Sequence, residues 1–315
     1  MRIFKNLAEL PKFTNAVLTI GSFDGVHKGH QKIIERVRQI AQQKAGESVL
    51  ITFYPHPRLV LAPDTTSLRL LNTIEEKIAL LERYGIDNLV IVPFTQAFLQ
   101  QSAEAYIQQF LIDQFQPAAL VIGYDHRFGR NRRGSIADLR RYAARDGFEI
   151  VEIQKQEVAD IAVSSTKVRQ ALRDGDVKTA AQLLNHPFEL RGTVVKGQQI
   201  GKTLGFPTAN LQVAESHKLI PPVGIYAVRV HHRDQVHGAM LYIGNRPTLV
   251  EYDNRTIEVN IFDFDQDLYG QLLRVEFIDH IREDQHFEGL EALRLQLMKD
   301  EQSARAILSA QNSNS

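Results

Sequence analysis

The first half of the chain alternates short apolar runs with helix-like segments, and this rhythm limits the folds that it can adopt. Between the runs, segments such as 30–43 repeat apolar residues at the spacing of one helix face. The runs themselves are strand candidates, and they lie at residues 17–20, 49–53, 89–92, 120–122 and 148–153. Strands that alternate with helices predict an α/β domain with a doubly wound parallel sheet. Ligands of such sheets bind beyond the carboxyl ends of the strands, where the strand order reverses.

From residue 188 onward the pattern changes to short strands separated by turn residues. We expect these strands at 190–195, 225–230, 239–243, 257–262 and 272–277, followed by a helix at 287–299. They predict a small antiparallel β-barrel domain with a C-terminal helix. Two short helices at 164–185 connect the halves, so the expected domains are 1–185 and 186–310.

Length and composition narrow the class of protein. A chain of 315 residues suits two domains of the usual ~100–200 residues. Basic and acidic residues balance at 37 each, which argues against nucleic acid as a partner. The absence of cysteine excludes disulfides, thiolate metal sites and a cysteine nucleophile. No apolar run approaches the ~20 residues of a membrane span, and no signal-peptide core is present. We expect a cytoplasmic protein without a membrane partner, as a monomer or weak homo-oligomer.

The stretch between the first strand and its helix is Gly-rich and reads GSFDGVHKGH, residues 21–30. Glycines let the backbone approach a ligand closely, and a helix N-terminus offers free N–H groups to an anion. His27 and His30 are three residues apart, so they share one face of the first helical turn. The stretch is a candidate phosphate site. A tight turn with two solvated histidines is the plainer alternative, and the lack of a third ligand nearby disfavours zinc.

A second Gly-rich stretch, GQQIGKT at residues 197–203, comes close to a phosphate-binding P-loop without being one. A P-loop has four residues between its first glycine and its Gly-Lys pair, and here there are three. A P-loop also leads into a helix, which Gly205 and the following Phe206-Pro207 pair oppose. What remains is a strand, a flexible loop and a turn that ends in Pro-Thr-Ala-Asn.

One predicted barrel strand carries a carboxylate. Ile257, Val259 and Ile261 face one side of it, so Glu258 and Asn260 face the other. The pattern alone leaves two alternatives for Glu258, which are the solvent side of a strand and a general base.

The H-x-G-H element of the first site resembles the nucleotidyltransferase superfamily, whose domain is Rossmann-like. The longer G-x-F-D-G-x-H-x-G-H is similar to the flavin adenylyltransferase branch, as are residues 52–57, 123–129 and 164–169 in that order. The resemblance implies transfer of AMP from ATP to FMN, with release of pyrophosphate. Its nucleophile is a phosphate anion, so such a site needs positioned hydrogen-bond donors, not a strong base.

This resemblance implies roles for residues of the first half. His27, His30 and Arg169 are the implied catalytic residues. Asp125 is an implied flavin contact, with nucleotide contact as an alternative. The implied ATP and phosphate ligands are Gly21, Phe23, Asp24, Gly29, Ser164, Ser165 and Thr166.

Further alternatives concern Asp24, His56 and Arg169. Asp24 could form a turn or lie near Mg²⁺, and His56, between two prolines, could be structural. Arg169 could be a helix-surface charge paired with Asp174 or Glu157.

The second half resembles the riboflavin kinase family in its G-F-P-T-A-N stretch, residues 205–210, and in residues 218–227, 243–248 and 268–270. The resemblance implies that a Gly-rich loop with Gly197, Gly201, Lys202 and Gly205 covers ATP phosphates. Thr208 and Asn210 would hold Mg²⁺, for which oxygen ligands are suitable. Glu258 would accept the proton of the riboflavin hydroxyl, and Arg282 would contact flavin.

Two positions depart from that family's pattern. Asn260 stands where many relatives carry histidine, and Asp284 stands where the R-x-E-x-x-F pattern has glutamate. Neither change removes the implied base or metal ligands.

Together, the two halves resemble a bacterial bifunctional riboflavin kinase and FAD synthetase, which implies riboflavin, FMN, FAD and ATP as its small-molecule ligands. Three other functions compete with this one. A nucleotidyltransferase for another phosphate, with a non-catalytic barrel, would leave the P-T-A-N turn and Glu258 without a role. An RNA-binding protein would need a basic surface. A flavin-binding protein without activity would not need two ATP-type loops.

Overall fold

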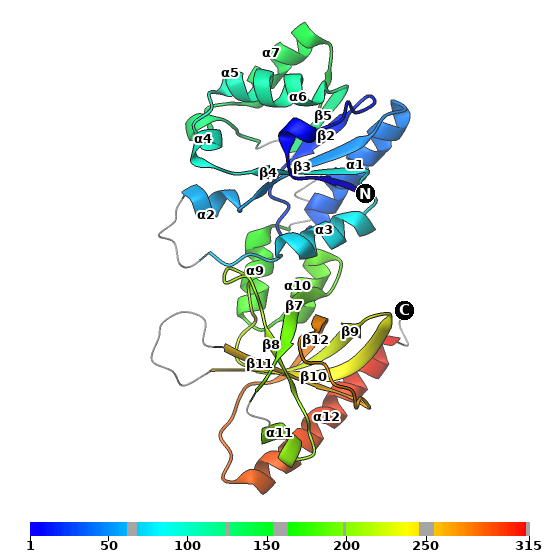
Figure 1. The fold of residues 1–315 in the computed structure, drawn as a ribbon, viewed down its shortest axis with the longest axis vertical. Coiled ribbons are helices and arrows are strands. Elements are labelled where there is room, and N and C mark those ends of the chain that lie inside the picture. The colour runs from blue at the N-terminus through cyan, green and yellow to red at the C-terminus, as the bar shows by residue number, and fades with distance from the viewer. Residues whose placement is uncertain (62–67, 124–125, 154–162, 198–199, 246–254, 313–315) are drawn as a thin grey trace. The chain divides into compact units, whose positions relative to one another are not determined.

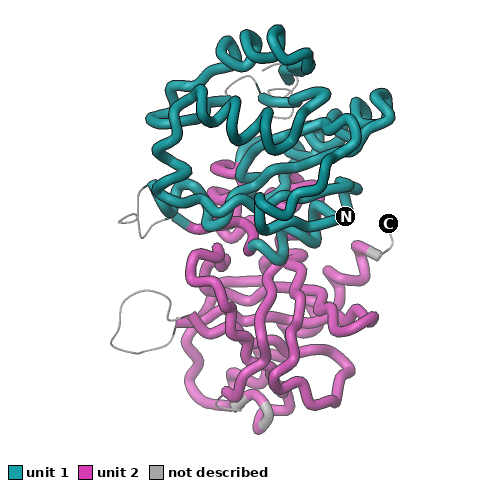
Figure 2. Tube along the Cα trace, turned by 45° about the horizontal axis from the view of Figure 1, so that its top comes forward, with its two compact units in different colours: residues 1–68, 74–164 teal, residues 69–73, 165–315 magenta. Residues whose placement is uncertain are grey.

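The structure is a computed structural model, and it describes residues 1–61, 68–123, 126–153, 163–197, 200–245 and 255–312. The chain divides into two units, which Figure 2 shows in separate colours. The first unit consists of residues 1–68 and 74–164, and the second of residues 69–73 and 165–315.

The first unit contains the predicted parallel sheet (Figure 1). Its strands are β1 (Arg2–Phe4), β2 (Val17–Ile20), β3 (Ser48–Tyr54), β4 (Asn88–Pro93), β5 (Ala119–Gly123) and β6 (Glu149–Ile153). They lie in the order β1-β4-β3-β2-β5-β6, with parallel pairing throughout the described sheet. The chain builds outward from β2 to β4 and then continues on the other side of β2 with β5 and β6. The strand order therefore reverses at β2, where a ligand site is expected.

Helices cover both faces of this sheet, as the sequence predicts. They are α1 (Lys28–Gln43), α2 (Pro57–Leu61), α3 (Ile74–Arg83), α4 (Gln96–Leu99), α5 (Ala103–Ala105), the π-helix η2 (Tyr106–Ile112), α6 (Asp113–Phe115) and α7 (Ile136–Asp146), with short 3₁₀ turns η1 (Leu7–Glu9) and η3 (Arg130–Arg132). Successive strand residues enter different cores because side chains alternate along a strand. Leu18 shares a buried cluster with Phe110, whereas Val17 shares one with Val37 of α1.

The second unit contains a closed antiparallel barrel. Its strands are β7 (Phe188–Val195), β8 (Ala209–Gln212), β9 (Gly224–His232), β10 (Gln235–Asn245), β11 (Arg255–Ile261) and β12 (Leu272–Arg282), and they close in the order β10-β11-β8-β7-β12-β9. The helices are α9 (Ser165–Arg173), α10 (Val177–Leu184), α11 (Ile200–Thr203) and α12 (Leu290–Asn312). The predicted helix pair α9 and α10 groups with the barrel in this unit.

Two predictions for the second half need correction. Residues 209–212 form strand β8, although the sequence indicates only the end of a turn there. The C-terminal helix begins at Leu290 and continues to Asn312, well beyond the predicted end at 299. The extra turns form because Ala304 and Leu308 pack with Met240 and Phe262 of the barrel unit.

A buried lysine joins the segment 69–73 to the barrel unit. Lys218 is 1% exposed, and its Nζ donates to the carbonyl oxygens of Leu71 at 2.7 Å and Glu189 at 2.6 Å. The same ammonium lies 4.4 Å from the centre of the Phe188 ring. Hydrogen bonds and the ring face together offset the cost of burying this charge.

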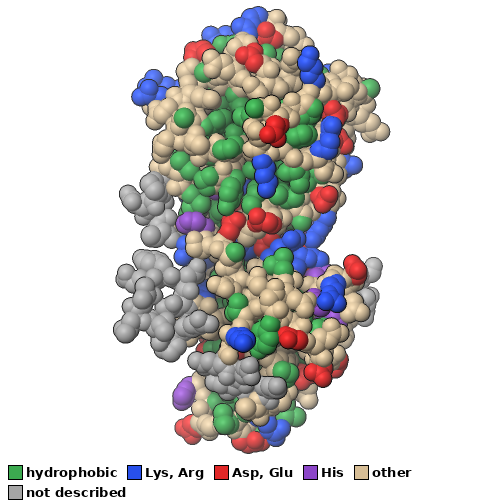
Figure 3. Space-filling view, viewed as in Figure 1, with side chains coloured by type: hydrophobic (Ala, Val, Ile, Leu, Met, Phe, Trp, Pro, Cys, Tyr) green, Lys and Arg blue, Asp and Glu red, His purple; other side chains and the backbone are tan. Residues whose placement is uncertain are grey.

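The surface carries charges of both signs. On the face shown in Figure 3, lysine and arginine side chains are interspersed with aspartate and glutamate. Among the described residues, no helix combines the length and the apolar character needed to cross a membrane.

Candidate active sites

The loop between β2 and α1 has a backbone that most side chains avoid. The φ angles are 46° at Phe23, 86° at Gly25 and 41° at Val26. Positive φ is normal for glycine but unusual for a β-branched residue such as valine. Backbone strain of this kind is concentrated at functional sites. The loop follows the strand at which the sheet order reverses, so position and conformation both favour a ligand site here.

His27 and His30 lie together at the start of α1, as the sequence predicts. His27 is the N-cap residue, and its Nδ1 accepts the backbone N–H of His30 at 3.4 Å. The two histidine rings stack with their centres 3.7 Å apart, and the centre of the Phe23 ring lies 5.0 Å from that of His30. The Nδ1 of His30 is buried and has no hydrogen-bond partner among the described residues. An orphaned buried nitrogen beside a helix N-terminus is suited to an incoming anion.

The pKa of His30 lies well below its ordinary value of 6.5. Burial of the ring is the main cause, and the nearby His27 and Lys77 add charge repulsion. Lys77, on α3, is 5% exposed and was not found by the sequence reasoning. Without a bound anion, His30 is therefore neutral at neutral pH.

We expect His30 to make the first unit less stable in mild acid. Its folded pKa is depressed, so below pH ~6.5 the unfolded chain binds a proton that the folded chain refuses. Stability is then lost as the pH falls from ~6.5 toward the folded pKa of His30. Calorimetric melting between about pH 7.5 and pH 5.5 should show a smaller loss of Tm for His30→Gln than for the unchanged protein. Equal losses in both proteins would contradict the assigned depression.

The other residues predicted for the first site are distributed over both units. Asp24 is 2% exposed in the β2–α1 loop, and Gly21 and Gly29 flank that loop. Ser164 is exposed at the end of the first unit, whereas Ser165 begins α9 in the second.

Arg169 of α9, in the same helix as Thr166, is 7% exposed, and its Nε donates to the carbonyl oxygen of Arg69 at 2.7 Å. Its side chain is therefore largely buried, and Asp174 accepts hydrogen bonds from Gln170. His56 is 8% exposed and accepts the backbone N–H of Arg58. Asp125 and Glu157 lie outside the described residues.

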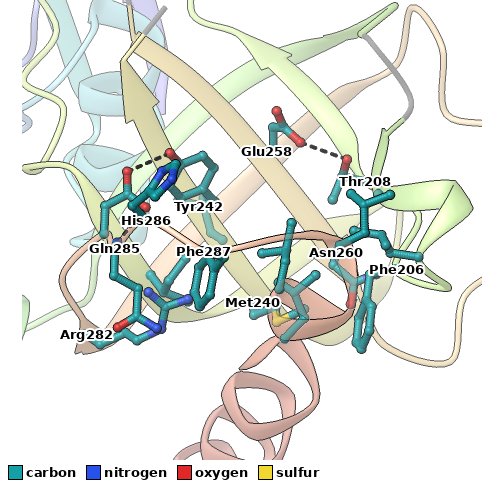
Figure 4. A pocket seen from close by; sticks show the side chains of 18 of the residues that line it. Phe206, Thr208, Met240, Tyr242, Glu258, Asn260, Arg282, Gln285, His286 and Phe287 are labelled. Atoms are coloured by element: carbon teal, nitrogen blue, oxygen red, sulfur yellow. Dashed lines mark hydrogen bonds between the residues drawn. The ribbon is translucent and has the colours of Figure 1, made fainter. Parts of the chain in front are cut away.

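The barrel brings the predicted kinase residues onto one face of two neighbouring strands. Glu258 of β11 lies directly opposite Asn210 of β8 in the antiparallel pairing. Thr208, two residues before Asn210, points to the same side, as does Asn260, two residues after Glu258. The Thr208 hydroxyl donates to Glu258 Oε2 at 3.0 Å (Figure 4). The opposite face of β11 is buried in the barrel, as the alternation predicts.

The Gly-rich loop before β8 has structural reasons for two of its glycines. A Cβ at Gly197 would lie 2.1 Å from Nδ2 of Asn210, so only glycine lets that amide approach. At Gly201 a Cβ would lie 2.3 Å from the Phe206 carbonyl oxygen. The helix in this loop, α11, spans only Ile200–Thr203, which agrees with the rejection of a P-loop. The side chain of Lys202 lies outside the described residues.

Two cavities meet at Thr208. The larger has a volume of about 550 Å³ and an apolar wall that includes Phe206, Met240 and Leu293. Glu258 also lines this cavity. The smaller has about 360 Å³ and is lined by Thr208 together with residues of the 264–269 loop. Thr208 is thus shared by two spaces whose volumes are in the range of small-molecule binding pockets.

Arg282 lines the larger cavity, but its guanidinium is already engaged. Its Nε and Nη2 donate to the carboxylate of Asp300 at 2.9 and 2.7 Å, and Asp300 is 1% exposed. Sequence reasoning missed Asp300, because nothing in the α12 sequence distinguishes it from the other acidic residues of that helix.

Tyr242 is a second cavity residue that the sequence reasoning missed. Its hydroxyl donates to Asp284 at 3.0 Å, and it lies opposite Glu258 in the β10–β11 pairing. Burial raises the pKa of Tyr242 to about 12, with a further contribution from Asp284. The correct register of the β10–β11 hairpin would have identified this residue.

Family models match both halves of the chain. The model described as FAD synthetase matches residues 10–167, and the model described as riboflavin kinase matches residues 184–308.

Individual proteins agree over nearly the full length. The bifunctional riboflavin kinase/FMN adenylyltransferase of Listeria monocytogenes is 38% identical, covering 93% of this chain and 92% of that protein. The Bacillus subtilis enzyme is 36% identical with 92% and 91% covered. A crystal structure described as a macrolide-efflux protein from Streptococcus pneumoniae has a TM-score of 0.85 at 31% identity, covering 96% of this chain and 98% of that one. The chain therefore belongs to the bifunctional riboflavin kinase/FMN adenylyltransferase family.

Proposed function

We propose that the two activities of the family are divided between separate sites of this chain. The activities are riboflavin kinase, which makes FMN, and FMN adenylyltransferase, which makes FAD. We assign the adenylyl transfer to residues 1–185 and the phosphoryl transfer to residues 186–310. Each assignment follows from the nucleophile of the reaction, which is a neutral hydroxyl in the kinase step and a phosphate anion in the adenylyl transfer.

The kinase reaction needs a base, because its nucleophile is a primary hydroxyl of the ribityl chain. Glu258 is the proposed base, and the observation that carries the assignment is its contact with Thr208 where the two cavities meet. The flavin ring would occupy the larger, apolar cavity and the nucleotide the smaller one. The hydroxyl would then approach the γ-phosphate beside Glu258, as in-line transfer requires.

Mg²⁺ fits the donors on this face. Thr208 offers a hydroxyl oxygen and Asn210 an amide oxygen, and a magnesium ion in phosphoryl transfer commonly takes one or two protein oxygens plus phosphates and water. Bound there with ATP, the ion would spread the negative charge of the transferred group. The Gly197–Gly205 loop would cover the phosphates, and Arg282, held by Asp300, would support the flavin wall.

The adenylyl transfer needs donors instead of a base, because FMN attacks through an anionic phosphate. His27, His30 and the α1 N-terminus are the proposed donors, and the orphaned Nδ1 of His30 supports this role. Arg169 and the hydroxyls of Ser164, Ser165 and Thr166 are proposed to complete the phosphate site, with Asp125 toward flavin. We propose that the protein is a monomer or a weak homo-oligomer.

The proposal predicts an ordered pair of products. Purified protein incubated with riboflavin, ATP and Mg²⁺ should form FMN first and FAD afterwards, as resolved by chromatography of the flavins. Omission of Mg²⁺ should stop FMN formation. If the protein instead converted supplied FMN to FAD but did not phosphorylate riboflavin, the proposed kinase role of the barrel would be refuted.

A further inference from the structure

Asn260 makes a contact that links the two parts of the proposed kinase site. It is 7% exposed, and its Nδ2 donates to the carbonyl oxygen of Pro207 at 2.8 Å. Proline has no backbone N–H, so the carbonyl is the backbone group through which Pro207 itself can form a hydrogen bond. The next residue in the chain is Thr208.

The contact closes a small ring of interactions. From Asn260 it passes to Pro207, along the backbone to Thr208, through the Thr208 hydroxyl to Glu258, and back along β11. This ring lies next to the paired stretch of β8 and β11, in which Glu258 faces Asn210 and Val259 faces Ala209. In Figure 4, Thr208, Glu258 and Asn260 all line the cavity, and the Glu258 carboxylate is hydrogen-bonded to Thr208.

We propose that Asn260 is a positioning residue for phosphoryl transfer, which acts by fixing the Pro207–Thr208 peptide and thereby the Thr208 hydroxyl against Glu258. The inference rests on the proposed kinase function of Glu258. Asn260 has no group able to take up a proton at neutral pH, so its contribution is to hold geometry through a donated hydrogen bond. A shift of about 1 Å in such a constellation can reduce turnover about 100-fold.

The test compares riboflavin kinase kinetics of the full-length protein in matched variants. Asn260→Asp keeps the side-chain size but removes the donor, and it places an anion against the Pro207 carbonyl. Asn260→His offers a ring N–H in its place. Gln235→Glu makes the same amide-to-acid change at an exposed position of β10 and serves as the control. Melting curves and FAD formation from supplied FMN report on folding.

Asn260→Asp should lower kcat by about 10- to 100-fold while KM for riboflavin changes less than about threefold. Asn260→His should recover part of that loss, and Gln235→Glu should retain full turnover. In a double-mutant cycle with Thr208→Val, the combined loss should be no larger than the greater single loss, because both changes disrupt one unit.

Three results would overturn the inference. They are an unchanged kcat in Asn260→Asp, a rise in KM alone, which would indicate direct substrate contact, and losses that multiply in the cycle. If Asn260→Asp fails to fold, an Asn260→His protein that folds but has no more turnover than Thr208→Val also overturns it. A parallel Glu258→Gln variant distinguishes failure of this inference from failure of the proposed kinase function. If Glu258→Gln kept full kinase activity, the assignment of Glu258 as the base would be refuted.

Discussion

Glu258→Gln should stop the formation of FMN from riboflavin while FAD still forms from supplied FMN. The substitution keeps the shape of the side chain and its cross-strand position but removes the only carboxylate that contacts Thr208 among the described residues. A positioned general base typically contributes ~100- to 10,000-fold to a rate, so kinase turnover should fall by that amount. The measurement is the initial rate of FMN formation, with adenylyl transfer from FMN assayed in the same preparation.

Glu301→Gln is a suitable control for this prediction. Glu301 lies on α12 and forms a partly exposed ion pair with Arg305 at 2.9 Å. Exposed pairs of this kind contribute about 0–1 kcal/mol, so both activities should remain. Loss of both activities in a folded Glu258→Gln protein would contradict the assignment of Glu258 to one reaction.

His30→Ala should have the opposite effect, so that FMN accumulates and FAD does not form. His30 stacks on His27 at the N-terminus of α1, and its Nδ1 has no partner among the described residues. Removal of one donor to a developing charge typically costs ~100- to 1,000-fold in turnover. Pyrophosphate release from ATP with supplied FMN measures the loss, and the kinase rate of the same protein should be unchanged.

The substitution at His30 also leaves a cavity, so a second variant is needed. His30→Gln keeps more of the side-chain volume and should lose adenylyl transfer with less loss of stability. Gln39→Ala, at an exposed position of the same helix, should retain both activities. Normal FAD formation by both His30 variants would refute the role of this histidine.

The sequence predicts the large elements of both halves because their apolar patterns span many residues. It misses β1 (Arg2–Phe4) and β8 (Ala209–Gln212), since strands this short carry no pattern of their own and form through pairing with β4, β7 and β11. The predicted end of the C-terminal helix, α12, was wrong for a related reason. Its last turns depend on packing of Ala304 and Leu308 against the barrel unit, which is not visible in local sequence.

The candidate sites show the same limit. Motifs single out His27, His30, Thr208 and Glu258 individually, but the contact between Thr208 and Glu258 joins residues 50 positions apart. Only the register of β8 on β11 brings them together.

Residues that act through distant partners leave still less trace in the sequence. Asp300 pairs with Arg282, 18 positions away, and Tyr242 with Asp284, 42 positions away. Lys77 is distinguished only by its burial and its effect on the pKa of His30.

The most direct test of the whole account mixes the two inactive variants. Glu258→Gln and His30→Ala, combined in one tube with riboflavin, ATP and Mg²⁺, should restore FAD formation, because FMN released by one protein is adenylylated by the other. Each variant alone should make no FAD from riboflavin. The account would be contradicted if the mixture of folded variants made no FAD and one of the two proteins proved to lack both activities. That result would show that the two reactions do not have separate sites.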